Sequence, residues 1–327
     1  SHILVRGAYD NPGEVVERGT PSFLPPMKGN SDVKSRMDLA NWMVDPQNPL
    51  PARVAVNRFW QQLFGTGIVR TSEDFGAQGE WPSHPALLDY LALRFVNSGW
   101  DVKALMKEMV MSHTYQQSSV ASPADYQRDP SNRLLARGSR HRLDAEVIRD
   151  QIMATSGLLN AELFGKSVKP PQPEGLWKAV SLPSSYPREY KPDTGDKIYR
   201  RSLYTFWKRA MPPPHMSIFN APSREECVAR RERTNTPLQA LLLLNETEYL
   251  KAAQRLASRT LVDAADDPQR LQVIFETVTG QLPDPQVQAS LVGLANDLQS
   301  MYDQSPELAA ELCGEAELPA SVTSQEL

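Results

Sequence analysis

Apolar residues recur at helical spacing through most of the chain and predict a run of amphipathic helices. The segments with this pattern in the first half of the chain are 35–44, 48–67, 83–99, 101–110 and 142–159. In the second of them, Pro51 suits a first helical turn and Gly65 suits a helix end. Ser83 and Asp101 are of the residue types that cap helices, so we expect each to begin the helix that follows it.

The last third of the chain repeats one start signal, a capping residue followed by proline. Proline fits the first helical position because its missing N–H would have no partner there. The four occurrences are Thr236-Pro237, Asp267-Pro268, Asp284-Pro285 and Ser305-Pro306. Each opens an apolar run, which predicts helices over most of residues 236–313.

Three segments lack the helical pattern. Residues 1–30 are rich in Gly and Pro and predict an extended arm or linker, and residues 161–197 hold six prolines, which predict a long loop. Residues 199–209 (YRRSLYTFWKR) alternate and are aromatic, so they are the best strand candidate. The expected fold class is mainly α, a multi-helix bundle-like domain with a long Pro-rich loop and one or two short β-strands.

The expected domain organisation is an arm followed by one mostly helical domain over residues 31–327. A subdivision of that domain follows the composition along the chain. Its expected parts are a helical half (31–160), a Pro-rich loop and strand insert (161–235) and a second helical half (236–327). The chain opens at Ser1, and residues 321–327 read as the beginning of a helix, so both ends resemble cuts in a longer protein.

Composition limits the classes of protein that fit. With 327 residues, 40% hydrophobic and 23% charged, the chain is neither collagen-like, nor disulfide-dense, nor disordered throughout. No apolar run approaches the roughly 18 residues of a membrane span, so none is expected. The net charge of −4 is uneven: residues from Leu261 onward carry twelve Asp and Glu against Arg270 alone, and residues 1–260 carry +7. A basic body could bind an anionic partner, although solvated surfaces explain the same charges.

Cysteine and histidine spacing gives no local metal motif. The five histidines do not pair at helical spacing and there is no CxxC, so no metal site is expected. Cys227 and Cys313 are interpreted as two buried thiols, with a long-range disulfide as the alternative.

An acidic, glycine-containing loop is the candidate for catalysis. Carboxylates and a histidine lie within twelve residues beside an aromatic ring that could stack on a sugar, which suits general acid–base chemistry. The alternative is that these carboxylates cap helices and pair with nearby arginines. The candidate catalytic residues are Asp74, Glu80 and His84. The candidate substrate-binding residues from this loop and the preceding helix are Asn57, Arg58 and Trp81.

A second candidate surface covers residues 188–233, where eleven Lys and Arg accompany six Asp and Glu and several aromatic side chains. Arginine binds carboxylates and sulfates bidentately and aromatic rings stack, so an anionic or sulfated polysaccharide would fit. A nucleic-acid partner is not expected, because the pI is 5.8 and no nucleic-acid-binding module is recognised. The alternative is a strand with buried aromatics and internally paired arginines. The binding candidates here are Arg200, Arg201, Tyr204, Trp207 and Arg209.

The segment RHRLDAEVIRD places charges one helical turn apart, at Arg142, Glu146 and Asp150, with Arg149 beside them. An ion-pair network that braces helices is the favoured interpretation. A substrate clamp is the alternative.

Several long strings occur in a distinctive order. They are NPLPARVAVNRFWQQLFGTGIVRTSEDFGAQGEWPSHPALLDYLA, SGWDVKALMKEMVMSHTYQQSS, RHRLDAEVIRDQIMATSGLL, YRRSLYTFWKR and RTNTPLQALLLLN. Together they resemble the planctomycete domain family known as domain of unknown function 1553, from about His2 to the end of the chain. The resemblance implies no assigned catalytic residue.

The resemblance also implies a setting. Such domains typically form the C-terminal part of exported proteins with a cytochrome-c-like domain upstream, which implies a periplasmic or extracellular location and a link to polysaccharide utilisation. Any haem would belong to that upstream domain, so no cofactor is expected in this chain. The family usually continues past the position of Leu327 with an apolar helix, which implies a truncated end here.

The sequence therefore favours a binding or structural module of a secreted multidomain protein. Its expected partners are polysaccharide or its own upstream domains. The alternative is a carbohydrate-active enzyme, hydrolytic or redox-coupled, that uses the loop 73–84.

Overall fold

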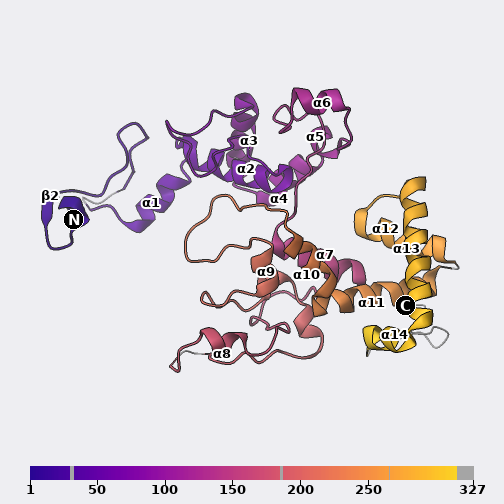
Figure 1. Ribbon diagram of the computed structural model, residues 1–327. Coiled ribbons are helices and arrows are strands. Elements are labelled where there is room, and N and C mark those ends of the chain that lie inside the picture. Colours follow the sequence, from indigo (N-terminus) through magenta and orange to yellow (C-terminus); the bar gives the residue numbers. More distant parts are fainter. Residues whose placement is uncertain (30–32, 185–186, 265, 315–327) are drawn as a thin grey trace. The chain divides into compact units, whose positions relative to one another are not determined.

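The computed structural model describes residues 1–29, 33–184, 187–264 and 266–314. Over these residues the fold is mainly α, as predicted, and its one sheet is two-stranded (Figure 1). The chain forms two compact units, Ser1–His141 and Arg142–Leu327. The division comes before the helix at 145–156 rather than after residue 160, because that helix packs against later helices of the second unit.

The N-terminal arm contains the sheet. Strands β1 (His2–Leu4) and β2 (Pro12–Val15) pair antiparallel around the short 3-10 helix η1 (Val5–Gly7), so the segment expected to be an extended arm or linker begins with a hairpin. The short helix α1 (Arg36–Met43) follows, begun by a capping box between Ser35 and Asp38.

Helices α2 (Pro49–Phe64), α3 (Pro85–Asn97) and α4 (Val102–Val110) enclose the core of the first unit. Their facing residues are Val56, Trp60, Leu88, Leu91, Phe95, Leu105 and Met109. Asn48 caps α2 and Gly65 ends it at φ 79°, a backbone conformation that glycine adopts without strain. Two short helices, α5 (His113–Gln116) and α6 (Pro123–Arg128), complete the helices of this unit.

The predicted cap of α4 is confirmed and that of α3 is wrong. Asp101 accepts a hydrogen bond from the Ala104 N–H, as a capping residue does. The residue before α3 is His84, whose side chain makes no capping bond, and Ser83 instead donates to the Ile68 carbonyl.

The second unit begins with α7 (Ala145–Ser156), which Gly157 ends. In its described residues, the long Pro-rich segment that follows contains the short helix α8 (Leu176–Val180) and the 3-10 helices η2 (Gly195–Tyr199) and η3 (Ser202–Tyr204). The strand predicted over 199–209 is therefore wrong: this segment makes only isolated bridges, such as Val168 with Thr205.

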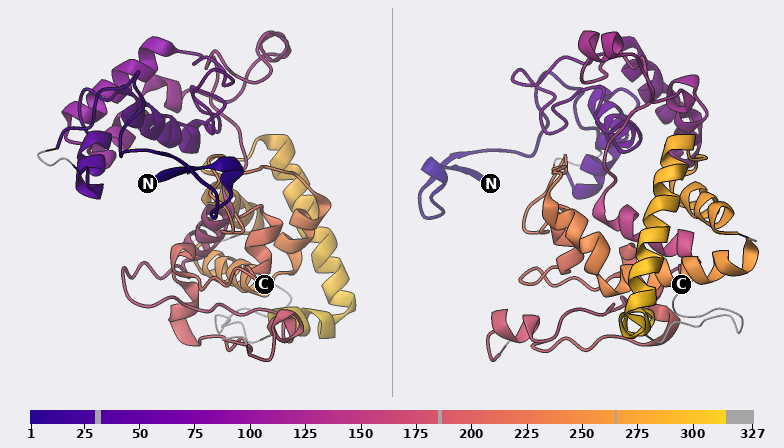
Figure 2. Two further views of the ribbon diagram at one scale, coloured as in Figure 1. Left: turned by 90° about the vertical axis from the view of Figure 1, so that its left-hand side faces the viewer. Right: turned by 45° about the vertical axis from the view of Figure 1, so that its right-hand side comes forward.

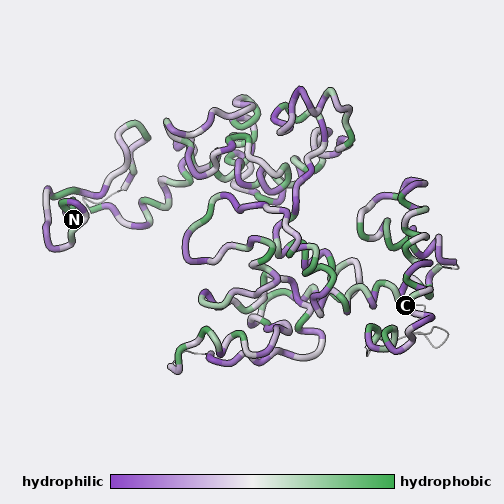
Figure 3. The backbone as a smooth tube through the Cα atoms, viewed as in Figure 1, coloured by the Kyte–Doolittle hydropathy of each residue, from purple (hydrophilic) through white to green (hydrophobic). Residues whose placement is uncertain are grey.

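The remaining helices of the second unit are α9 (Pro214–Ile218), α10 (Pro237–Asn245), α11 (Thr247–Asp263), α12 (Asp267–Thr279), α13 (Pro285–Gln304) and α14 (Pro306–Cys313). The leucine-rich α10 is green in Figure 3, and α12 to α14 are the orange-to-yellow helices of Figure 2. Helices α7, α9 and α11 bring Met153, Met216 and Tyr249 together in the core.

The four cap–proline signals all mark helix starts. At α10, α13 and α14 the proline occupies the first helical position, whereas α12 begins one residue earlier than expected because Asp266 is its cap. The helix expected to begin at 321–327 lies outside the described residues.

Neither Cys227 nor Cys313 forms a disulfide, and the interpretation of both as buried is corrected: Cys227 is exposed and Cys313 is buried. None of the described helices is both long enough and apolar enough to cross a bilayer.

Candidate functional site

The side chain of Asn57 on α2 hydrogen-bonds to the loop between α2 and α3, residues 65–84. The Asn57 amide donates to the Val69 carbonyl (2.9 Å) and to the Ser72 hydroxyl (3.2 Å), and its oxygen accepts from the Val69 N–H (2.8 Å). Asn57 is fully buried, so it positions the loop and does not present itself to a ligand. Its neighbour Arg58 is exposed on α2.

Further bonds brace the loop internally. The Thr71 hydroxyl donates to the Asp74 carbonyl (2.7 Å) and accepts from the Glu80 N–H (2.9 Å). The loop also needs glycine at Gly79, because a Cβ there would lie 2.1 Å from the Asp74 carbonyl oxygen. The loop is therefore a tightly folded element in spite of its polar composition.

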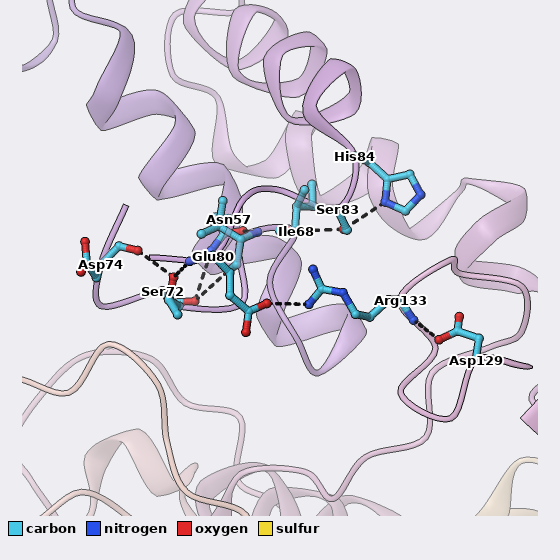
Figure 4. Close-up of polar contacts among 11 residues, drawn as sticks. Asn57, Ile68, Ser72, Asp74, Glu80, Ser83, His84, Asp129 and Arg133 are labelled. Carbon is cyan, nitrogen blue, oxygen red and sulfur yellow. Dashed lines mark hydrogen bonds and ion pairs between the residues drawn. The ribbon is translucent and has the colours of Figure 1, made fainter. Parts of the chain in front are cut away.

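Each of the three candidate catalytic residues has a partner of its own, and Figure 4 shows those of Glu80 and His84. The Asp74 carboxylate accepts from the Gly76 N–H (2.6 Å), Glu80 forms an ion pair with Arg133 (3.1 Å), and the His84 ring lies 3.0 Å from the Ser83 hydroxyl. Among the described residues, no hydrogen bond or ion pair joins these three side chains to one another. This is the arrangement that the alternative interpretation of caps and arginine pairs expects.

Trp81 differs from its neighbours in the loop. It follows directly after Glu80, and 87% of its surface is exposed. The Glu80–Arg133 ion pair ties this part of the loop to the segment that follows α6, where Asp129 accepts the Arg133 N–H (2.9 Å). The indole is therefore presented to solvent by backbone that is fixed on several sides.

In the second unit, two of the predicted binding residues, Arg200 and Tyr204, bond to the backbone of the loop at residues 162–166. The buried guanidinium of Arg200 donates to the carbonyls of Glu162, Phe164 and Lys166, and it stacks on the Tyr204 ring with its carbon 3.8 Å from the ring centre. The Tyr204 hydroxyl in turn accepts from the Phe164 N–H (2.7 Å). These contacts correct the expectation that Arg200 and Tyr204 belong to an open binding surface.

Three other predicted residues remain accessible. Arg201 is exposed and lies 3.6 Å from Asp150, and Arg209 is exposed and lies 3.5 Å from Glu225. Trp207 is half-buried, and the Arg224 guanidinium lies 4.2 Å above its ring centre. This basic and aromatic group belongs to the second unit and the Trp81 loop to the first.

The ion-pair network expected around 142–150 exists, with partners other than those expected. Glu146 pairs with Arg231 (2.5 Å), whereas Arg142 donates to the amide oxygens of Gln239 (2.7 Å) and Asn220 (2.8 Å). Arg149 forms a fully buried pair with Glu248. Helical spacing indicated the charged face, but the partners lie some 80 to 100 residues away and could not be predicted from local sequence.

Sequence reasoning missed a polar pocket of the second unit, next to Tyr199 and α11. Lys251 and Arg255 line it, one helical turn apart, together with residues near 160 and 196. The spacing of the two cations was visible in the sequence, but the rest of the lining was not. In the part of the chain that the structure describes, no group of three His, Cys, Asp or Glu side chains could hold a metal ion.

Comparison with known families gives one match. The family model described as a protein of unknown function (DUF1553) matches residues 35–295, which is most of the chain. No curated protein and no solved structure matches the chain.

Proposed function

The chain belongs to the DUF1553 family, and we propose that it is a non-catalytic module that binds polysaccharide, with Trp81 as the principal contact. The observation that carries the proposal is the 87% exposure of Trp81 on the braced loop. A large apolar ring held in water in this way loses unfavourable hydration when a sugar ring stacks on it.

The rigidity of the loop supports this proposal as much as the exposure does. Binding costs less when the contacting side chain and its backbone are already ordered. Asn57, Thr71 and the Glu80–Arg133 pair supply that order before any ligand arrives. The loop polar groups that could have served as acid or base are engaged in the same bracing, which favours binding over catalysis.

We further propose that the polysaccharide is anionic. In the second unit, Arg201, Arg209 and the Arg224–Trp207 stack leave guanidinium groups accessible, and guanidinium groups bind sulfate and carboxylate strongly. Residues 1–260 carry a net charge of +7, which would favour the approach of such a chain. Binding that depends on these charges weakens as salt rises.

The test is a thermal-shift panel of neutral, carboxylated and sulfated polysaccharides at low and physiological salt. A ligand of the folded state raises the melting temperature by mass action. We expect an anionic polysaccharide to raise it, less so at higher salt, and the shift to disappear in Trp81→Ala. Tyr9→Ala is the matched control, because Tyr9 is an equally exposed aromatic residue (89%) of the same unit.

A flat response across the panel, or an equal shift in Trp81→Ala, would overturn the proposal. The same samples test the enzyme alternative. Release of reducing ends by the unmodified chain, lost in Glu80→Gln, would favour a hydrolase.

A further inference from the structure

A groove of about 450 Å³ runs between helices α11, α12, α13 and α14, within the second unit. Its lining on α11 extends from Leu250 to Leu261, a rise of about 16 Å or three helical turns. All four helices contribute aliphatic side chains to it, among them Leu250, Leu261, Leu271, Ile274, Leu298 and Leu312. The lining includes none of the residues proposed above to bind polysaccharide.

The helices around the groove are tied to one another. The Gln254 amide on α11 donates to the carbonyls of Leu312 and Cys313 at the end of α14, and Cys313 is buried. The Gln288 amide on α13 donates to the Pro268 carbonyl on α12 (2.8 Å). The groove is therefore present before any partner arrives, which lowers the cost of binding.

Two of these helices have an apolar side that the second unit itself does not cover. A surface helix of a globular protein normally buries one apolar stripe. No residue of α12 or α13 is buried in the part of the chain that the structure describes. In the groove itself, Leu298 on α13 is 42% exposed and Leu312 on α14 is 45% exposed.

The charge around the groove is strongly negative. Residues 261–314 carry nine Asp and Glu against Arg270 alone, and Arg270 pairs with Asp267 (2.7 Å). Asp303 and Glu311 are exposed, and each is next in the chain to a residue of the lining. The two cations of α11 that line the polar pocket described above do not line this groove. Its electrostatic complement is therefore a basic partner.

We propose that this groove binds a basic amphipathic α-helix of a partner protein. An amphipathic helix enters such a groove with apolar side chains at i, i+3, i+4 and i+7, and three turns of it match the length of the lining on α11. Its apolar side chains would contact Leu298 and Leu312, and its Lys and Arg would face Asp303 and Glu311. An acidic helix would be repelled by the same carboxylates.

The test is fluorescence anisotropy of three labelled peptides of about 14 residues, four helical turns, titrated with the full chain. The first has leucine at i, i+3, i+4 and i+7 and lysine elsewhere. The second replaces each lysine by glutamate, and the third replaces each leucine by serine. We expect the Leu–Lys peptide to saturate one site, with an affinity that falls as salt rises. The other two should bind at least about tenfold more weakly, because each lacks one of the two complementary features.

A pair of variants on one helix assigns the binding to the groove. Leu298→Gln should weaken the Leu–Lys peptide by about tenfold or more, because an apolar contact of the groove is lost. Leu294→Gln is the matched control, since Leu294 lies one turn away on α13, is 56% exposed and does not line the groove. Both leucines are partly in solvent, so urea unfolding should show similar stabilities for the two variants.

Four results would overturn the proposal. They are no saturable binding of the Leu–Lys peptide, equal binding of the Leu–Glu peptide, equal binding of the Ser–Lys peptide, and equal affinities in Leu298→Gln and Leu294→Gln. Sedimentation of the same samples identifies the other occupant: self-association of the chain that Leu298→Gln abolishes, without peptide binding, would assign the groove to a second copy.

Discussion

The buried ion pair between Arg149 on α7 and Glu248 on α11 is the contact whose loss should destabilise the second unit most. The guanidinium meets the carboxylate through two hydrogen bonds, Nε to Oε2 (3.0 Å) and Nη2 to Oε1 (2.9 Å). The side chains are 0% and 2% exposed. The remaining donors reach the carbonyls of Ile198 (2.8 Å) and Arg200 (3.0 Å), so one side chain joins two helices to the segment between them.

The perturbation is Glu248→Gln. Burial alone would lower the pKa of Arg149, but the hydrogen bonds and charge of Glu248 raise it above its ordinary value. Glu248→Gln removes this compensation, but the guanidinium stays charged at neutral pH because arginine is effectively always protonated in proteins. A buried charge is then left without a partner. Breaking a buried pair in this way costs about 3 to 5 kcal/mol.

The assay is urea unfolding of the second unit, followed by tryptophan fluorescence and far-UV circular dichroism. Arg149→Met should destabilise by a similar amount, because it leaves the carboxylate unpaired. The double variant Arg149→Met/Glu248→Leu should lose much less stability than the two single variants lose together, since it buries no charge. Arg94→Met is the control: its pair with Glu108 is 61% and 33% exposed, and such a pair is worth about 0 to 1 kcal/mol.

Two results would refute this reasoning. One is a loss below about 1 kcal/mol in Glu248→Gln, the scale of an exposed pair. The other is a double variant whose loss equals the sum of the single losses, because the two groups would then act independently.

Three further predictions follow from single residues. Burial, with Arg149 nearby, lowers the pKa of His215 to about 3. The stability that the neutral His215 contributes is therefore complete above pH 6.5 and falls by about 1.4 kcal/mol per pH unit below it. His215→Gln should flatten the dependence of the urea midpoint on pH between pH 7 and 5, and an unchanged slope would contradict this. A thiol reagent should modify Cys227 rapidly and Cys313 only on unfolding, and two equally fast thiols would count against the burial of Cys313. Gly79→Ala should lower the stability of the first unit by about 1 to 3 kcal/mol, because its Cβ would overlap the Asp74 carbonyl oxygen. An unchanged melting temperature would contradict this, because it would show that the loop backbone shifts to make room for the added carbon.

Most helices could be predicted because their ends carry local chemistry. Asp101, Thr236 with Pro237, and Asp284 with Pro285 act through backbone groups of their own first turns, so neighbouring residues suffice to reveal them. Ser83 failed as a cap because the Ile68 carbonyl, fifteen residues away, takes its hydroxyl. A long-range partner of this kind leaves no trace in the local pattern.

The strand predicted over 199–209 failed for a similar reason. Its alternation of charged and aromatic residues suits a half-buried strand, but Arg200 turns inward to three carbonyls of 162–166 and Tyr204 stacks beneath it. These contacts fold the segment into η3 and isolated bridges. Burial of an arginine against carbonyls is a tertiary effect that outweighs the local strand preference.

The candidate site was predictable in its residues and less so in their roles. The exposure of Trp81 fits its position between polar loop residues, whereas Asn57 could not be recognised as a buried brace without the backbone of Val69. The pocket around Ser258 was beyond local sequence reasoning, because its walls come from three separate segments between residues 157 and 258.

The measurement that tests the proposed function most directly is a calorimetric titration of one anionic polysaccharide into the unmodified chain and into Trp81→Ala, at physiological salt. The proposal predicts saturable binding to the unmodified chain and an affinity at least about tenfold lower for the variant, as for the loss of a central aromatic contact. Equal affinities for the two chains would contradict it and would remove the braced loop from the binding surface.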